Sequence, residues 1–134
     1  MVNKFLKKII AKDQQGLNTI SAICSESKIK IGDIKFLKKN KIFLLLIDRF
    51  SKETNNKEKK IKSILKFEYI STSKSKNINQ NFNNTILELI SINLFQKDGN
   101  YEITLLFLNN VIITLTAEII EVTLEDQKIN DKNR

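Results

Sequence analysis

The stretch DGNYEITLLFLNNVIITL (residues 98–115) carries the clearest structural signal in the chain. Asp98–Gly99 is typical of a tight hairpin turn, in which the central residues need positive φ. Beyond this turn, apolar side chains recur at every second position, at Tyr101, Ile103, Leu105 and Phe107 and, after Asn109–Asn110, at Val111, Ile113 and Leu115. Period-two alternation indicates a strand with one buried face. The stretch therefore predicts two antiparallel strands of one sheet.

Similar patterns lie on the N-terminal side of this hairpin. Residues 42–47 are apolar at every position, as in a strand buried on both faces, and residues 65–69 alternate between apolar and charged. A further strand is expected near residue 90, with one parity formed by Ile86, Ile90, Ile92 and Leu94. The alternation changes parity at Gly32–Asp33, between Ile29 and Ile31 on one side and Ile34 and Phe36 on the other. Because one extra residue moves the apolar set to the other face, this change predicts a β-bulge.

One helix is predicted, near the N-terminus. Residues 4–11 form a short first strand, and Asp13 follows as the N-cap of a helix over 13–25. Leu17, Ile20 and Cys24 then recur at helical spacing. On this stripe we expect Cys24 to be a small buried side chain rather than a reactive thiol.

The remaining segments are predicted mainly as connections. Residues 38–41 are a polar turn, residues 51–60 a charged mobile loop, and residues 71–85 the longest loop. Residues 117–125 fit either a helix or a strand, and two β-branched residues favour a bent strand continuation. We expect one globular domain over residues 1–126 and a frayed tail over 127–134.

These elements predict an α+β fold. Successive strands with short connections pair antiparallel. The expected architecture is a mostly antiparallel twisted sheet or partly closed barrel of about seven strands, with one N-terminal helix over one end or face. A pleckstrin-homology-like barrel is one specific form, although its helix normally closes the chain, whereas here the helix opens it.

Charge is distributed unevenly along the 134 residues. The net charge of +8 combines +12 over residues 1–76 with −4 over residues 77–134. A basic first half suggests nucleic acid or an anionic membrane face as a partner. However, the chain has 21 Lys and two Arg beside 22 Ile and 16 Asn, all three favoured residues having A/T-rich codons. Genome composition is therefore an alternative origin for the lysines, and arginine is the residue preferred for bidentate recognition.

Composition excludes several kinds of site. The chain has no histidine and one cysteine, which excludes histidine bases, histidine-containing zinc sites and an intrachain disulfide. No metal and no cofactor are predicted. The longest apolar run, residues 42–47, is far shorter than a membrane span of about 20 residues. The lysines near the N-terminus are followed by no apolar stretch typical of a signal peptide, so a cytoplasmic location is expected.

Five residues are candidates for binding. Arg49 stands near a strand end and would contact an anion or a partner peptide, or else form a structural ion pair with Asp48, Asp33 or Glu68. Tyr69 is expected to be exposed, whereas most aromatic residues between 28 and 76 fall on core parities. Lys74, Ser75 and Lys76 lie in a Ser-rich loop that would hold a phosphate, or else serve as a solvated connector.

Carboxylates gather near the end of the chain. Glu118, Glu121, Glu125 and Asp126 offer oxygen ligands for a hard cation or groups for acid–base work. They lack calcium-loop spacing, so a solvated acidic strand edge is expected.

Several short motifs in collinear order resemble one family. They are Asp13–Leu17, Leu46–Phe50, Ile64–Phe67, Lys74–Asn79 and Leu115–Ile120. Over about residues 7–126, the chain is similar to the uncharacterised alphaproteobacterial family catalogued as domain of unknown function 2948. The resemblance implies a bacterial cytoplasmic setting and brings no activity with it. Where this chain has Asn77–Ile78–Asn79, members often have Gly-Ile-Asp, so a carboxylate is missing here.

The sequence leaves the function unknown. The first hypothesis is a small non-enzymatic binding or accessory module with a protein partner, because hairpin edges and loops are natural docking surfaces. The alternative is nucleic-acid binding through the Lys-rich first half, and a second alternative is an enzyme of unrecognised type.

Overall fold

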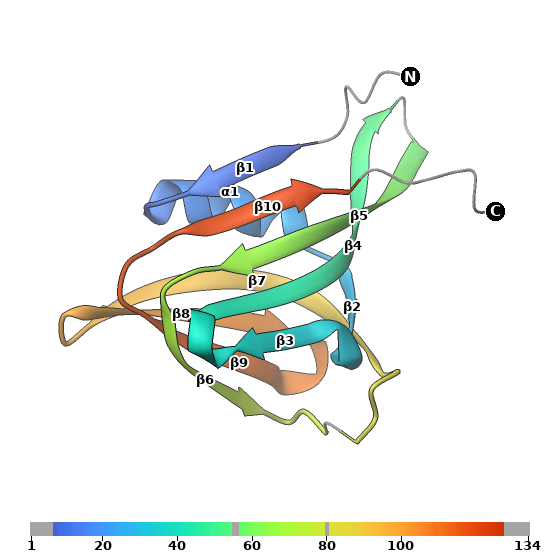
Figure 1. Cartoon of the computed structure of the whole chain (residues 1–134). Helices are drawn as coiled ribbons and strands as arrows, with labels where there is room; N and C mark the ends of the chain where they lie inside the picture. The colour runs from blue at the N-terminus through green and yellow to red at the C-terminus, as the bar shows by residue number, and fades with distance from the viewer. Residues whose placement is uncertain (1–6, 55–56, 80, 128–134) are drawn as a thin grey trace.

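The computed structural model describes residues 7–54, 57–79 and 81–127. It contains one α-helix, α1 (Gln14–Cys24), which follows the first strand (Figure 1). The strands in the described residues are β1 (Lys8–Ala11), β2 (Lys28–Lys30), β3 (Ile34–Leu37), β4 (Ile42–Thr54), β5 (Lys57–Phe67), β6 (Ile70–Lys76), β7 (Ile86–Lys97), β8 (Asn100–Phe107), β9 (Val111–Ala117) and β10 (Val122–Asp126).

All strand pairs in the described residues are antiparallel, and the sheet has the order β1-β10-β5-β4-β2-β7-β8-β9-β6, with β3 pairing to β4. The sheet curls, so that β3 and β6 lie on the same side of the molecule (Figure 1). Its two end strands, β1 and β6, do not pair with each other within the described ranges, and the sheet is not closed into a barrel. The prediction of an α+β fold with a large antiparallel sheet and one helix is confirmed, although the described residues form ten strands where about seven were expected.

The hairpins around β8 are as predicted. Asp98 and Gly99 have φ of 51° and 80°, and Lys97 pairs with Asn100 across the turn. Asn109 and Asn110 also have positive φ and join β8 to β9. Asn and Gly reach this conformation at lower cost than other residues, so local sequence sets both turns.

The predicted helix is confirmed with its cap. The side chain of Asp13 accepts a hydrogen bond of 2.8 Å from the N–H of Gly16, and Leu17, Ile20 and Cys24 are buried. Helix α1 packs against β7 and β1. It is the sole helix longer than one turn in the described chain, and it is too short to cross a membrane.

The parity change near Gly32 has a different cause from the one predicted. Residues Ile31–Asp33 form a 3-10 turn, not a β-bulge, and this turn separates β2 from β3. The N–H of Gly32 donates to the carbonyl of Asn83 at 2.9 Å. The strand is broken here because its backbone turns away to bond the segment before β7.

A bulge occurs instead in β7, where the single predicted parity is wrong. Ile86 and Ile90 are exposed, and Leu87 and Leu89 are buried in their place. The register shifts between Leu89 and Ser91, which returns Ile92 to the core. Its N–H donates to Oγ of Ser21 on α1 at 2.9 Å, a tertiary hydrogen bond that the strand pattern does not reveal.

Two segments that were predicted as loops are largely strands, so these two predictions are wrong. The segment 51–60 continues β4 as far as Thr54 and begins β5 at Lys57, with residues 55–56 outside the described chain. The first part of 71–85 is β6, which pairs with β9. Residues 51–54 pair with residues 57–59 of the same segment and so extend the β4–β5 hairpin, whereas β6 pairs with apolar residues of β9. In both places backbone pairing, rather than apolar content of the segment itself, determines the structure.

The ends of the chain form an outer part of the sheet. The bent strand expected over 117–125 is instead two strands, because β9 ends at Ala117 and β10 pairs with β5 and β1. The predicted first strand is described from Lys8 to Ala11, and the predicted tail lies outside the described residues beyond Gln127. The core between α1 and the sheet is mainly Leu, Ile and Phe.

Candidate functional site

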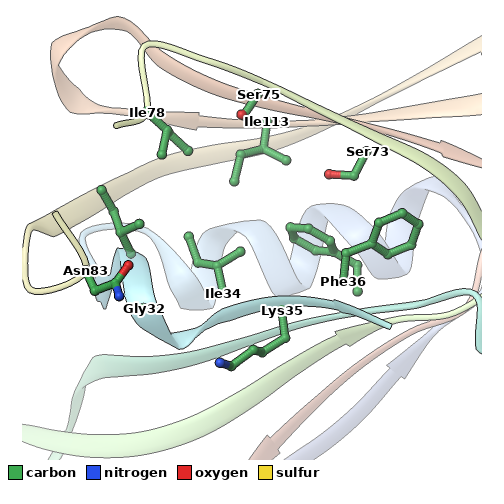
Figure 2. Close-up of a pocket in the computed structure, with 11 residues that line it drawn as sticks. Gly32, Ile34, Lys35, Phe36, Ser73, Ser75, Ile78, Asn83 and Ile113 are labelled. Atoms are coloured by element: carbon green, nitrogen blue, oxygen red, sulfur yellow. The ribbon is translucent and has the colours of Figure 1, made fainter. Parts of the chain in front are cut away.

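The free edges of β3 and β6 face each other across a gap in the curled sheet. In the described residues β3 pairs only with β4, and β6 only with β9. Each strand therefore has one edge with no strand partner. Figure 2 shows Ser73 and Ser75 of β6 on one side of the gap and Ile34 and Phe36 of β3 on the other.

The gap is closed at both ends by backbone hydrogen bonds. At one end the N–H of Ile70, the first residue of β6, donates to the carbonyl of Lys41 at 2.9 Å. At the other end Gly32, just before β3, donates to Asn83 at the same distance. Since β3 begins at the Gly32 end and β6 begins at the Ile70 end, the two strands run in opposite directions across the gap.

A cavity of about 420 Å³ occupies this gap, and we call it the seam groove. It is lined by Ile31, Gly32, Ile34, Lys35, Phe36, Phe43, Ser73, Ser75, Ile78, Asn83 and Ile113. Its floor is apolar: Phe43 and Ile113 are buried, and the rings of Phe36 and Phe43 lie 6.2 Å apart between centroids. The volume is in the range of ligand pockets.

The groove is open because β6 has serine at core-facing positions. Ser73 pairs with Leu115 of β9 and Ser75 pairs with Ile113, and both β9 residues are buried on the inner face. Paired residues of adjacent strands point to the same face of a sheet. Ser73 is half-buried and Ser75 is exposed, so small hydroxyl side chains border the groove beside the large apolar ones of β9.

Positive charge surrounds the groove on its outer side. Lys74 and Lys76 are exposed and alternate with the two serines along β6, so they lie on its opposite face. Lys35 is exposed on β3 and points away from the gap in Figure 2. Among the described residues that line the groove there is no aspartate or glutamate.

The structure brings three of the five candidate residues together at this place. Lys74, Ser75 and Lys76 lie on β6 rather than in a loop, and Ser75 lines the groove. Tyr69 is 40% exposed, as expected, and directly precedes β6 with a φ of 61°. It does not line the groove, and Arg49 lies elsewhere.

Arg49 is buried, with 2% of its surface exposed, and forms a structural ion pair. Its Nε and Nη2 donate to Oδ1 and Oδ2 of Asp126 at 2.9 and 2.6 Å. Ser63 Oγ and the N–H of Lys7 also donate to this carboxylate, at 2.6 and 2.7 Å. The predicted pairing with Asp48, Asp33 or Glu68 is wrong. The partner, Asp126, lies on β10, 77 residues away along the chain, and nothing in the local sequence indicates the pairing. Burial also excludes Arg49 as a surface contact for an anion or peptide.

The environment of Asp126 stabilises its charged form. Burial raises the pKa of this carboxyl, but hydrogen bonds from Arg49, Ser63 and Lys7, with the charge of Arg49, outweigh burial and hold the pKa below its usual value. The expectation that Asp126 belongs to a solvated acidic edge is therefore wrong. Glu118, by contrast, is exposed and pairs with Lys41 at 2.8 Å.

Cys24 is fully buried on α1. Burial raises the pKa of its thiol to about 12, with a smaller lowering effect of Arg49 and a smaller raising effect of Asp126. A thiol in this environment stays protonated and unreactive at neutral pH. The prediction of a small buried side chain is confirmed.

Several lysines of the basic first half are engaged in ion pairs. Lys62 contacts Asp48 at 2.9 Å and Lys66 contacts Glu68 at 3.5 Å. Lys28 also pairs with Glu88. Within the described ranges, no three Asp, Glu, Cys or His side chains gather as a candidate metal site.

Sequence reasoning missed that Ile34 and Phe36 of β3, and Ile78 beyond β6, line the groove. These three residues lie partly buried against the core, and nothing in their spacing distinguishes them from other core residues. The available signal was in β6, where serine recurs at positions 71, 73 and 75. If this segment is taken to be a strand beside β9, the serine repeat predicts a polar inner face.

The architecture and the groove define a class of small α+β protein with a large antiparallel sheet and an open seam. The chain matches the family described as Protein of unknown function (DUF2948) over residues 7–133. The chain belongs to this family, as the resemblance predicted, and the family brings no assigned activity. No curated protein and no solved structure matches the chain.

Proposed function

We propose that this chain is a non-enzymatic binding module that holds an extended segment of a partner protein in the seam groove. The observation that carries this proposal is a cavity with an apolar floor that lies between two strand edges, neither of which has a strand partner in the described chain. Strand edges offer backbone donors and acceptors to an added strand, and pockets beside them receive its alternate side chains. The groove provides both features in one place.

The position of the titratable groups favours binding over catalysis at this groove. Of the described groups, Cys24 and Asp126 have clearly shifted pKa values. Both lie outside the groove, and both are buried. An active site is expected to combine a pocket with perturbed groups, and here the two features are separate.

The proposed setting is the bacterial cytoplasm. The motifs that resemble an alphaproteobacterial family support a bacterial source. A single cysteine is consistent with a reducing compartment, because no intrachain disulfide can form. Fluorescence microscopy of a tagged full-length chain in a bacterial host would test this location, and a signal confined to the cell envelope would contradict it.

Selection from a random peptide library, displayed on phage, tests the proposed function. The full-length chain is immobilised, and the bound peptides are synthesised and measured by fluorescence polarisation. Ser73→Trp fills the groove, and Ser75→Leu is a milder variant at its lip. Thr19→Trp, on the exposed face of α1, is the matched control.

We expect selected peptides to bind the unmodified chain and the Thr19→Trp variant equally and to lose at least about tenfold in affinity with Ser73→Trp or Ser75→Leu. Circular dichroism confirms that each variant is folded. Failure to select any peptide, or peptides that bind all three variants equally, would contradict a peptide-binding groove. A small molecule retained in the groove, detected by native mass spectrometry, would also contradict it.

A further inference from the structure

We infer that the segment bound in the seam groove is an acidic strand, with apolar side chains directed inward and aspartate or glutamate at the alternate positions directed outward along β6. This inference rests on the proposed function and specifies the chemistry of the partner. Its basis is the period-two pattern that the sequence places on the two faces of β6.

The two faces of β6 have different chemistry. Ser73 and Ser75 face the groove, whereas Lys74 and Lys76 face solvent. A strand added to the free edge of β6 has the same two-residue period, so its alternate side chains fall on the same two faces. One set therefore enters the groove, and the other lies beside the lysines.

The inner face selects apolar side chains. The added strand would place this set over Ile34, Phe36 and Ile78, which are partly buried, and above the buried ring of Phe43. Burial of apolar surface in such a cavity is favourable, at roughly 25 cal/mol per Å². The small Ser73 and Ser75 leave the space that these side chains would occupy.

The outer face selects negative charge. Opposite charges that are directly across from each other on adjacent strands stabilise the pair, and like charges destabilise it. Lys74 and Lys76 would lie across from the outward residues of the partner, and Lys35 is exposed on the opposite edge. The described residues that line the groove include no carboxylate, so the lining itself does not oppose an acidic strand.

The same charges disfavour a second copy of this chain as the occupant. If two β6 edges paired, lysines would lie beside lysines across the new interface. Edge lysines are a known device against such self-pairing. A partner of opposite charge has no such penalty, and the lysines therefore discriminate between a second copy and an acidic strand.

The test uses labelled peptides of seven residues, the length of β6. One peptide alternates Glu with Val, a second alternates Lys with Val, and a third has the Glu/Val composition in two blocks, which removes the two-residue period. A fourth is the alternating Glu/Val peptide with N-methyl groups at every second residue, which removes backbone donors. Binding to the full-length chain is measured by fluorescence polarisation at low and high salt.

Matched charge reversals identify the residues responsible for the preference for an acidic peptide. The double variant Lys74→Glu/Lys76→Glu reverses charge on β6, and Lys12→Glu/Lys97→Glu makes the same change in net charge at exposed positions outside the groove lining. We expect the first variant to lose about tenfold in affinity for the alternating Glu/Val peptide and to gain affinity for the Lys/Val peptide. The second variant should retain the preference for the acidic peptide.

Several results would overturn the inference. They are equal or tighter binding of the Lys/Val peptide, undiminished binding of the blocked or N-methylated peptide, equal losses in the two charge-reversal variants, and dimerisation of the chain that Ser73→Trp abolishes. Competition by single-stranded RNA at the groove would also overturn it. The proposed function is tested separately, since groove-dependent library peptides without the acidic alternation would support the groove and reject the acidic strand. A library that yields no groove-dependent peptide would reject both.

Discussion

Polar side chains border the core both at the Arg49–Asp126 pair and on the inner face of β6, and the two places differ in how fully the space around them is filled. The ion pair Arg49–Asp126 is buried, and we call it the sealed pair. Ser63 and Lys7 donate further hydrogen bonds to its carboxylate. At the seam groove, Ser73 and Ser75 stand beside an open cavity of about 420 Å³. Burial of polar groups therefore does not by itself mark a binding site. Unfilled space over an apolar floor, beside strand edges without a partner in the described residues, is the more specific sign.

The largest effect is expected from breaking the sealed pair. Asp126→Asn removes the charge that compensates Arg49 and should lower the free energy of unfolding by about 3–5 kcal/mol, because an unpaired charge remains buried. Urea denaturation, followed by circular dichroism, measures this change. The control replaces the cluster as a unit with Arg49→Met, Ser63→Ala and Asp126→Leu, and a much smaller loss is expected. An equal loss in the single and the triple variant would show that the charge pair is not the cause.

The inner faces of β9 and β6 provide the second contrast. Leu115→Ala should cost about 2–5 kcal/mol, since Leu115 is fully buried and leaves a cavity. Ser73→Ala, at the paired position on β6, should change the free energy of unfolding by less than about 0.5 kcal/mol, because its side chain already borders open space. Similar losses in both variants, by the same urea measurement, would mean that the groove side is packed like the core.

Acid should weaken the sealed pair and leave the groove unaffected. The folded-state pKa of Asp126 lies below its unfolded value, so the carboxylate stabilises the fold above about pH 4 and this contribution is lost as the pH falls through the folded-state pKa. The loss should be smaller than that from Asp126→Asn at neutral pH. Urea denaturation between about pH 5 and 2.5 should show a shallower decline in the triple variant than in the unmodified chain. Parallel declines would argue against this role of Asp126.

The smallest effect is a gain in stability at the groove. Ser73→Val adds apolar volume on the inner face of β6 and should stabilise the fold by about 0.5–2 kcal/mol, as cavity-filling substitutions commonly do. Val is also favoured in strands. Thermal unfolding monitored by circular dichroism would measure the gain, with Thr72→Val on the outer face as the control. A loss of stability with Ser73→Val would mean that the hydroxyl, rather than the empty space, matters there.

The parts of the fold set by local sequence were predictable. The cap at Asp13, the turn at Asp98–Gly99 and the alternation in β8 and β9 depend on residues close together in the chain. The sequence did not predict that β7 has a bulge or that the strand breaks at Gly32. The bulge is fixed by a hydrogen bond to Ser21, and the break by one to Asn83, and both partners are distant in sequence. Polar strands such as β6 were missed because their neighbours supply the apolar surface.

The candidate site was predictable in part. The polar stretch in the sequence identifies Lys74, Ser75 and Lys76 as candidates. In the structure they lie together on an edge strand rather than in a loop. Arg49 was notable as one of only two arginines, but its partner Asp126 lies 77 residues away along the chain. Geometry between distant segments, which creates both the groove and the sealed pair, is not encoded in local patterns.

The absence of a side chain at position 32 allows one end of the groove to close tightly. A Cβ added to Gly32 would lie 3.1 Å from Cβ of Asn83 and 3.2 Å from its carbonyl oxygen, closer than most such contacts in proteins. The segment that ends the groove would have to retreat by a few tenths of an ångström, and its hydrogen bond to residue 32 would lengthen. The absence of a Cβ at this position therefore lets the segment before β7 approach closely enough to make the hydrogen bond that closes this end of the groove.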